Sequence, residues 1–516
     1  MPTIDYFVIL IFSLLIVAAG VSFSKRGSDM KSYFAAGGSV PWSINGLSLY
    51  MSFFSAGTFV VWGSIAYQMG WVAISIQMTM CIGGFLVAFY TYIILFLSLA
   101  YTGAFLYPVA KIVNVSTGWP ITTCVIGLGA LILIYTIIGG LWAVIITDVL
   151  QFVILSIAII LVVYLSLQEV GGFQNFVAKV PDNFWNLTGG EYSWWFIAAF
   201  ALYNLVFIGG NWAYVQRYTS VETEKDAKKV GLTFGFLYLI SPLIWMLPPM
   251  VYKVINPNLG GLETEGAYMM ICKLVLPGGM LGLMLGGMVF ATASSVNTTL
   301  NLAASVITND IFLLLRPNAS DKQIMNTAKI ATLVFGIGTI GVALLVPYVG
   351  GIVNVVLSVG AVTGCSLYGP PIWALFSKRQ TGKSILQVTV LSLIVNIFLK
   401  MTFELSRANE MLFGTLFPFL LLAIYEAYFY IKKQNESPDY LKYQQLKTIA
   451  VPERSEKSQN TFAMKVLANT LIAIGLLLVG LGINSESSKL AIAVLGAMVI
   501  VIALFIHPVV KLKLND

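Results

Sequence analysis

The chain has few charged residues, a single histidine and only four cysteines. Asp, Glu, Lys and Arg make up 10% of its 516 residues, whereas a soluble domain carries about 25%. So few charges cannot cover a globular surface with polar groups, which excludes an ordinary water-soluble protein. Because the histidine, His507, lies near the end of the sequence, the long apolar segments offer no histidine-based metal site or proton relay.

The cysteines and the lack of catalytic motifs exclude further classes. The cysteines are scattered through apolar segments without metal-ligand spacing or a disulfide pattern, so we interpret them as small hydrophobic residues of helices. An enzyme is disfavoured because the sequence shows no paired acids or nucleophile motif in its core. A channel is disfavoured because no ring of like charges or filter loop is visible.

Hydrophobic sequence is what the chain has in abundance: 58% of its residues are hydrophobic and the mean hydropathy is +0.87. Apolar stretches of about 20 residues recur, each long enough to cross about 30 Å of hydrocarbon as a helix. The alternating pattern of an outer-membrane barrel is absent. The sequence therefore predicts an all-α polytopic membrane protein with about 14–15 transmembrane helices. The expected spans are residues 4–23, 41–67, 71–90, 91–113, 119–138, 142–168, 193–217, 229–253, 280–314, 324–346, 350–377, 383–404, 411–432, 461–484 and 489–510.

The net charge of +7 is explained by membrane topology. The first span, Ile4–Phe23, has no basic segment before it and no small-residue cleavage site, so it is expected to be a retained helix. Basic residues follow it at once, and alternation through the later spans places most Lys and Arg, including Arg217, on that same side. By the positive-inside rule this side is the cytoplasm. The chain is therefore expected in the cell membrane with its N-terminus outside. No nucleic acid partner is implied.

One segment resists this assignment. Residues Trp71–Val113 contain no polar loop and no charge before Lys111. A single helix of that length would run about 65 Å, twice the thickness of a bilayer. Two spans are therefore expected, although no turn is visible near Phe89–Tyr92.

Three spans combine signals for a helix break with hydroxyl or amide side chains. They are Ser52–Thr58, the segment from Asn204 to Gly209-Gly210-Asn211, and Ala291–Asn301. A break in a bilayer is tolerated only where it lines a cavity or is buried in protein. The third segment is too polar for a lipid-facing helix, which makes it the strongest candidate for a binding site.

A hard monovalent cation prefers several oxygen ligands, from hydroxyls and from carbonyls freed at a helix break. Ala291, Ser294 and Ser295 have i, i+3 and i+4 spacing, so a carbonyl and two hydroxyls share one helix face. Carbonyls of Met51 and Phe54 are candidates to complete a sodium site. The alternative is that the small hydroxyl residues only allow close helix packing.

Asp148 is the one acid deep inside an apolar stretch with no basic neighbour in the sequence. A charge inside a membrane costs about 3 kcal/mol or more, which makes such a residue a functional candidate. Three roles stay open for it: binding a cation, carrying a proton, or extending to the nearby cytoplasmic edge.

A solute site needs polar groups that converge near the middle of the membrane. Ser55, Thr58, Gln77 and Asn204 are the candidates, and Phe207 is a candidate wall. No Lys or Arg falls in the middle of a predicted span, so hydrogen bonding to a neutral, polyhydroxylated solute is favoured. An anion stays an alternative, because helix N-termini also bind anions.

At these residues the chain resembles the sodium:solute symporter family, whose members carry sugars, sialic acid, proline, iodide and vitamins. The likeness covers most of the chain, and its motifs are Tyr33–Gly38, Gly139–Ala143, Thr147–Gln151, Val215–Tyr218 and Ala291–Asp310.

The resemblance implies two five-helix repeats of inverted topology. The implied division is 1–40 as a leading helix and cytoplasmic loop, 41–168 and 193–377 as repeats, 169–192 as an extracellular loop, and 378–516 as C-terminal helices with a cytoplasmic linker, 433–460. The main sodium site of the family matches Met51, Phe54, Ala291, Ser294 and Ser295. A second sodium site, present in some members, matches Asp148, Ser294, Asn297 and Thr298, with Asn297 in place of a serine.

The substrate positions of the family match Ser55, Thr58, Gln77 and Asn204, with two departures. Tyr101 stands where sialic acid carriers have an arginine, and Tyr238 stands where sugar carriers have a lysine. Members also have a basic loop where this chain runs through Phe89–Tyr92.

The resulting prediction is sodium-coupled import of a small organic solute across the bilayer, with a sugar or related polyol favoured. The alternatives are a monocarboxylate, a vitamin or another anion as solute, and a proton-coupled permease of the same fold that uses Asp148.

Overall fold

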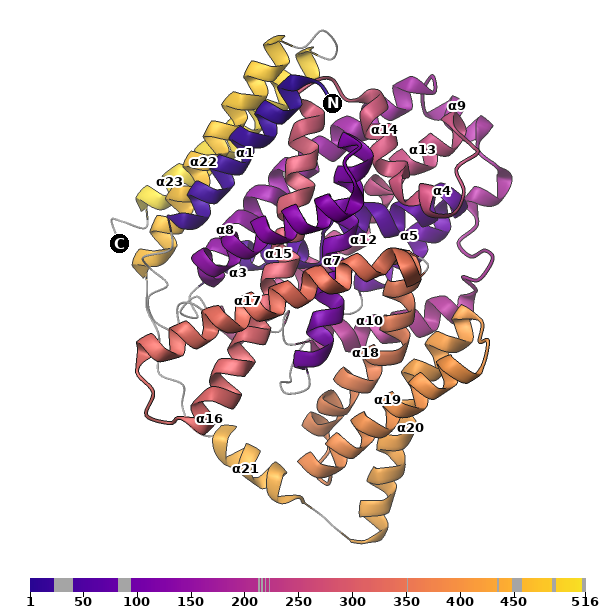
Figure 1. Cartoon of the computed structure of the whole chain (residues 1–516), viewed down its shortest axis with the longest axis vertical. Helices are drawn as coiled ribbons and strands as arrows, with labels where there is room; N and C mark the ends of the chain where they lie inside the picture. Colours follow the sequence, from indigo (N-terminus) through magenta and orange to yellow (C-terminus); the bar gives the residue numbers. More distant parts are fainter. Residues whose placement is uncertain are drawn as a thin grey trace.

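The computed structural model describes residues 1–22, 40–81, 94–211, 223–349, 351–433, 436–447, 457–484 and 489–512, with 214, 217, 218, 220 and 221. These residues are folded almost entirely as helices (Figure 1). The one pairing of extended backbone found among them is an isolated bridge between Gly189 and Tyr192. Helices suit a lipid environment, because they satisfy their backbone hydrogen bonds internally.

The first described helices include a broken span. Helix α1 (Thr3–Val21) is followed by α3 (Trp42–Phe53), and the chain then leaves helical geometry at Phe54. It resumes as the π-helical η2 (Thr58–Trp62) and α4 (Gly63–Met69), bent by 57° relative to α3. The predicted break in this span is therefore confirmed.

A tight turn joins α4 to α5 (Trp71–Met78) at Gly70. Gly70 has φ +59°, and a Cβ there would lie 2.6 Å from the Phe184 carbonyl oxygen. Only glycine fits this conformation and this close approach. The partner comes from residues 169–192, which contain the short helices α9 (Phe173–Lys179) and η3 (Asp182–Trp185). This connection packs on α5, where the Ser75 hydroxyl donates to the Leu187 carbonyl at 2.5 Å.

Helices α7 (Ile94–Thr117) and α8 (Ile121–Glu169) follow. The predicted spans 119–138 and 142–168 lie in one continuous run of helical backbone, α8, which has 49 residues and no non-helical turn. A straight helix of that length would run about 74 Å, more than twice the thickness of a bilayer, so the division into two spans stays a prediction. Gly139 and Gly140 lie between these two spans. Each glycine lowers helix propensity by about 1 kcal/mol, yet the backbone there stays helical. The expected turn near 89–92 lies outside the described residues.

The second half of the described chain is built around one buried helix. Helix α15 (Met280–Val306) is buried at every residue from Phe290 to Ala304. Helices α1, α3, α7, α8 and α17 pack against it. The other elements between Trp194 and Phe376 are α10 (Trp194–Gly210), α12 (Glu224–Trp245), α13 (Leu247–Ile255), η4 (Gly261–Gly266), α14 (Ala267–Val275), η5 (Ile307–Phe312), α16 (Leu313–Leu315), α17 (Asp321–Leu345), η6 (Val346–Val349) and α18 (Ile352–Phe376).

The last helices flank this core on two sides. Helices α19 (Gly382–Thr402) and α20 (Arg407–Ile431) pack against α18, drawn in orange in Figure 1. Helix α21 (Pro438–Lys447) lies in the polar linker. Helices α22 (Lys457–Asn484) and α23 (Lys489–Leu512) form a hairpin beside α1, so segments from the two ends of the chain lie side by side.

Nine of the described helices are long and apolar enough to cross a membrane, or ten if the bent pair counts as one span. Three more described apolar segments are shorter, including Trp194–Gly210. The prediction of an all-α, multi-span membrane protein is confirmed. The total of about 14–15 helices stays a prediction.

Asp5 links α1 to the central helix. Its side chain is fully buried, and Oδ1 accepts hydrogen bonds from the backbone amides of Gly279 at 2.6 Å and Gly282 at 3.0 Å. These amides belong to the N-terminus of α15, where amides lack partners within the helix and a negative charge is favoured. Asp5 therefore caps α15 from a distant part of the sequence.

We expect Asp5→Ala to lower the free energy of unfolding by about 1–2 kcal/mol, the usual cost of losing a helix cap. The measurement is the apparent melting temperature of the full-length protein in detergent. Asp5→Asn is the matched control, because its side-chain oxygen retains both bonds. An Asp5→Ala melting temperature equal to that of the wild type would contradict the capping role.

Candidate sodium and solute sites

The break after α3 frees two backbone carbonyls. The amide of Ser55 donates to Thr58 Oγ1 at 3.4 Å, and the amide of Thr58 donates to the Ser55 carbonyl at 2.9 Å. In an uninterrupted helix these amides would bond the carbonyls of Met51 and Phe54. The carbonyls of Met51 and Phe54 therefore lose these helical donors at the break.

Helix α15 supports the break through two hydrogen bonds. The amide of Ala56 donates to Thr292 Oγ1 at 3.0 Å, and Ser295 Oγ donates to the Ser52 carbonyl at 2.8 Å. In the chain, Ser52 directly follows Met51, and Ala56 is two residues after Phe54. The two bonds therefore hold the broken segment against α15, the helix that carries three of the predicted sodium ligands.

The five residues predicted for the main sodium site are all buried. They are Met51, Phe54, Ala291, Ser294 and Ser295. The Ser294 hydroxyl lies beside the Asp148 carboxylate, which it helps to stabilise. Ser294 therefore connects the predicted main sodium site with the acid of the predicted second site. Carbonyl and hydroxyl oxygens in this arrangement suit a hard cation such as sodium.

Asp148 lies on α8 and is fully buried. Its carboxylate accepts a hydrogen bond from Ser48 of α3 and pairs with the Arg217 guanidinium at 3.7 Å. The alternative that Asp148 extends to the membrane edge is therefore wrong. Two opposite charges inside a low-dielectric interior stabilise each other, whereas either alone would be very unfavourable.

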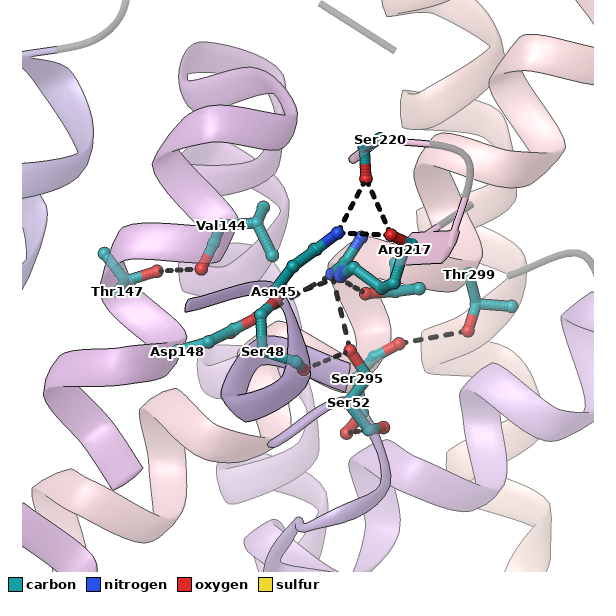
Figure 2. A network of polar contacts seen from close by, with 11 residues as sticks. Asn45, Ser48, Ser52, Val144, Thr147, Asp148, Arg217, Ser220, Ser295 and Thr299 are labelled. Atoms are coloured by element: carbon teal, nitrogen blue, oxygen red, sulfur yellow. Dashed lines mark hydrogen bonds and ion pairs between the residues drawn. The ribbon is translucent and has the colours of Figure 1, made fainter. Parts of the chain in front are cut away.

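Arg217 is the functional candidate that the sequence reasoning missed. It was placed among the cytoplasmic basic residues, but its side chain is fully buried. Nε donates to Ser48 Oγ at 2.9 Å, and Nη2 donates to Ser52 Oγ at 3.3 Å and Thr298 Oγ1 at 3.1 Å. Figure 2 shows this guanidinium between α3 and the neighbouring helices. The sequence signal that could have identified Arg217 is Asp148, because a buried acid requires a partner of opposite charge. Arg217 is a candidate for that partner, since it follows the predicted break at Gly209–Asn211.

The second predicted sodium site is brought together only in part. Thr298 contacts Arg217, which also pairs with Asp148. Asn297 is fully buried on the same helix. The guanidinium thus lies between a predicted hydroxyl ligand and the predicted carboxylate ligand of that site.

Gln77 and Asn204 lie on facing helices. Asn204 Nδ2 donates at 2.9 Å to the hydroxyl of Thr79, two residues beyond Gln77. Gln77 is 1% exposed, and neither its amide oxygen nor its amide nitrogen has a hydrogen-bond partner. A buried primary amide with no partner is unfavourable, so a bound polar molecule is a good explanation for its placement.

Helix α10 runs along the broken span, as two aromatic contacts show. The rings of Phe200 and Trp62 lie 6.0 Å apart, and those of Phe207 and Phe53 lie 6.4 Å apart. Asn204 shares the face of Phe200 and Phe207. It therefore faces the region of the break, where Ser55 and Thr58 use their hydroxyls to accept bonds from the backbone.

Two tyrosines, Tyr238 and Tyr101, depart from the family pattern. Tyr238 is fully buried in an aromatic cluster, with its ring 5.2 Å from that of Tyr50. The side chain of Tyr101 lies outside the described part of the chain.

Thr292→Val should destabilise the break, because a methyl group replaces the hydroxyl that accepts the Ala56 amide. Leaving that buried donor without a partner costs about 1–3 kcal/mol. The measurement is the melting temperature of the full-length chain in detergent, with Thr292→Ser as the control that keeps the hydroxyl. Equal melting temperatures for the valine variant and the wild type would show that this bond does not support the break.

Known proteins with similar sequences are sodium-coupled carriers. A sodium/glucose cotransporter of Vibrio parahaemolyticus is 26% identical over 81% of this chain and 89% of its own length. A sodium/sialic acid symporter of Proteus mirabilis is 27% identical over 65% of this chain and 76% of its own length.

A solved structure is similar in fold. It is a sodium-coupled sialic acid symporter in a substrate-bound outward-open state, which aligns with a TM-score of 0.68 and 23% identity. The alignment covers 83% of this chain and 98% of that one. The helical arrangement described above is therefore that of a known symporter fold.

A sequence profile of the sodium:solute symporter family matches residues 84–391. The matched region includes α8, α10, α15 and the residues Asp148 and Arg217. The match extends over more than half of the chain. The protein therefore belongs to the sodium:solute symporter family, and it is a sodium-coupled membrane carrier of a small-molecule solute rather than an enzyme.

Proposed function

We propose that this carrier imports a neutral, polyhydroxylated solute, a sugar or a related polyol, together with sodium. The observation that carries the proposal is the broken span, which hydroxyls of α15 hold through Ala56 and Ser52, together with the buried, unpartnered amide of Gln77. In this proposal the ion ligands and the solute ligand lie around one interruption of the helix.

Sodium binds, in this proposal, to the carbonyls of Met51, Phe54 and Ala291 and to the hydroxyls of Ser294 and Ser295. Because these ligands come from both α3 and α15, the ion stabilises the contact between the two helices. Loss of the ion to the cytoplasm weakens that contact and allows the solute to leave. Such a mechanism couples transport of the solute to transport of sodium, since the ion stabilises one arrangement of the helices more than the other.

The solute chemistry follows from the side chains around the break. Gln77 offers one acceptor and an NH₂ donor, which match the hydroxyls of a sugar or polyol. Ser55, Thr58 and Asn204 add neutral polar groups, and Phe207 supplies an apolar surface. Relatives named as glucose and myo-inositol cotransporters support this class.

An anionic solute is less well supported by the described residues. The buried guanidinium of Arg217 already pairs with Asp148. It is therefore not a free partner for a carboxylate. The sialic acid symporters among the relatives do not by themselves favour an acid for this chain.

The proposed movement is of the repeats 41–168 and 193–377 relative to each other, with 169–192 as an extracellular loop. The proposed orientation has the N-terminus outside and the linker 433–460 in the cytoplasm, as the positive-inside rule predicts.

Ser295→Ala should abolish sodium-dependent uptake, because it removes a proposed ion ligand and the hydrogen bond to Ser52. The measurement is uptake of radiolabelled hexoses and inositols into proteoliposomes under an inward sodium gradient. Thr332→Ala is the control, since Thr332 is another buried helical residue with a hydroxyl, which donates to the Ala328 carbonyl of its own helix. Unchanged sodium dependence in Ser295→Ala would refute the site assignment.

Gln77→Ala should weaken solute binding by about 5- to 150-fold while leaving sodium binding intact, because about 1–3 kcal/mol is lost with a buried hydrogen-bonding partner. The measurement is the shift in melting temperature of the detergent-solubilised protein produced by sugars and inositols, with sodium present. Gln387→Ala is a matched control at an exposed glutamine that contacts Tyr425. If the sugar or inositol that shifts the melting temperature of the wild type shifts that of Gln77→Ala equally, Gln77 is not a solute ligand.

A further inference from the structure

A cleft of about 210 Å³ lies between α18, α19 and α20, outside the groups assigned to sodium and solute. The three helices pack side by side (Figure 1). The cleft is smaller than the about 300–1,000 Å³ of a site for a drug-sized ligand, so it suits one small polar group. The lining residues that matter here are three polar ones, Asn396, Lys400 and Glu410, and three apolar ones, Leu399, Leu405 and Phe413.

Asn396 presents an acceptor that the protein does not use. Its Nδ2 donates to the Val362 carbonyl at 3.1 Å, to Ser366 Oγ at 2.9 Å and to the Gly414 carbonyl at 3.3 Å. Because two of these partners are carbonyls, which only accept, the nitrogen must face them and the oxygen is left over. Oδ1 is buried and has no hydrogen-bond partner among the residues that the structure describes, and the residue is 4% exposed. Such a group is unfavourable, and a ligand with an N–H or O–H donor would satisfy it.

An ion pair supplies both signs of charge beside this acceptor. Lys400 Nζ lies 2.8 Å from Glu410 Oε1 and donates to Ser358 Oγ at 3.0 Å. The Glu410 side chain is 10% exposed, whereas that of Lys400 is more open. A carboxylate has about four acceptor positions, so Glu410 can accept from a ligand while it is paired with Lys400. The cleft therefore suits a zwitterion, whose cationic donor faces Glu410 and whose anionic group faces Lys400.

The position of the cleft along the helices indicates where such a group comes from. Helix α19 has 21 residues, a length of about 32 Å that matches the hydrocarbon core of a bilayer. Lys400 and Glu410 lie within four residues of the turn that joins α19 to α20, which places them at the level of the lipid headgroups. Phe398, Met401 and Phe413 on these helix ends are half-exposed or more, as is suitable for contact with acyl chains.

We propose that this cleft binds the amine headgroup of a phospholipid of the phosphatidylethanolamine class. The ammonium donates to Asn396 Oδ1 and to the Glu410 carboxylate, and the phosphate lies beside the Lys400 ammonium. The acyl chains remain outside the cleft, along the apolar side chains of α19 and α20. The lipid thereby joins α19 and α20 to α18, and its binding does not depend on the sodium and solute assignments.

The test is equilibrium binding of radiolabelled phospholipids to the purified, delipidated full-length chain in detergent. Phosphatidylethanolamine should bind about tenfold more tightly than phosphatidylcholine or better, because a trimethylated headgroup has no N–H to donate to a charged acceptor. The N-methyl and N,N-dimethyl lipids should fall in between. Equal affinities across this series would overturn the proposal. The series needs no variant, so it is decisive whether or not substitutions in the cleft fold.

Glu410→Gln should lose most of the preference for phosphatidylethanolamine over phosphatidylcholine, because the ammonium loses its charged partner. Glu404→Gln is the matched control, since Glu404 is an exposed acid of the same turn that does not line the cleft. This control should keep the wild-type preference. A folded Glu410→Gln protein that also keeps it would show that the carboxylate does not recognise the headgroup.

Two further ligands separate the lipid from other sources of the same chemistry. Free O-phosphoethanolamine carries the headgroup without acyl chains and should compete more weakly than the lipid. If it competes equally well, the cleft is a site for a soluble amine and the assignment to a lipid is wrong. Phosphatidylglycerol offers hydroxyls but no ammonium and should bind no better than phosphatidylcholine. Binding as tight as that of phosphatidylethanolamine would refute recognition of the amine.

Discussion

The structure depends on one constraint: a backbone group inside a membrane protein must find a partner within the protein. The broken span after α3 satisfies it by exchanging helical bonds for bonds to side chains. Thr292 accepts the Ala56 amide, and Ser295 donates to the Ser52 carbonyl. Because the partners lie on α15, the interruption binds two distant parts of the chain together and leaves oxygens available for an ion.

The same requirement applies to charge. Asp148 and Arg217 come from different helices, and each would be very unfavourable if buried alone. Their pairing beside Ser52 connects the charged pair to the hydrogen bond between Ser52 and Ser295. The ion pair and the hydrogen bond between Ser295 and Ser52 therefore belong to one network (Figure 2). This arrangement suits a carrier, in which an ion must alter the contact between helices.

Several features could be predicted because they are local. Hydrophobic runs showed the multi-span helical class, and the sequence Ser52–Thr58 showed the break, since glycine and hydroxyls there weaken a helix and offer alternative bonds. The i, i+3, i+4 spacing of Ala291, Ser294 and Ser295 identified a shared face of one helix. No turn separates the two predicted spans inside α8, because Gly139 and Gly140 lower helix propensity without removing any hydrogen bond.

The sequence by itself determined the membrane class, the position of the break and the polar face of α15, because hydropathy and helical periodicity act over short distances. Only the tertiary structure decided which groups meet. It placed Arg217 beside Asp148, 3.7 Å apart although many residues separate them in the chain. It also left the amide of Gln77 buried without a partner. Such pairings depend on how the helices pack around α15, and no local pattern encodes that packing.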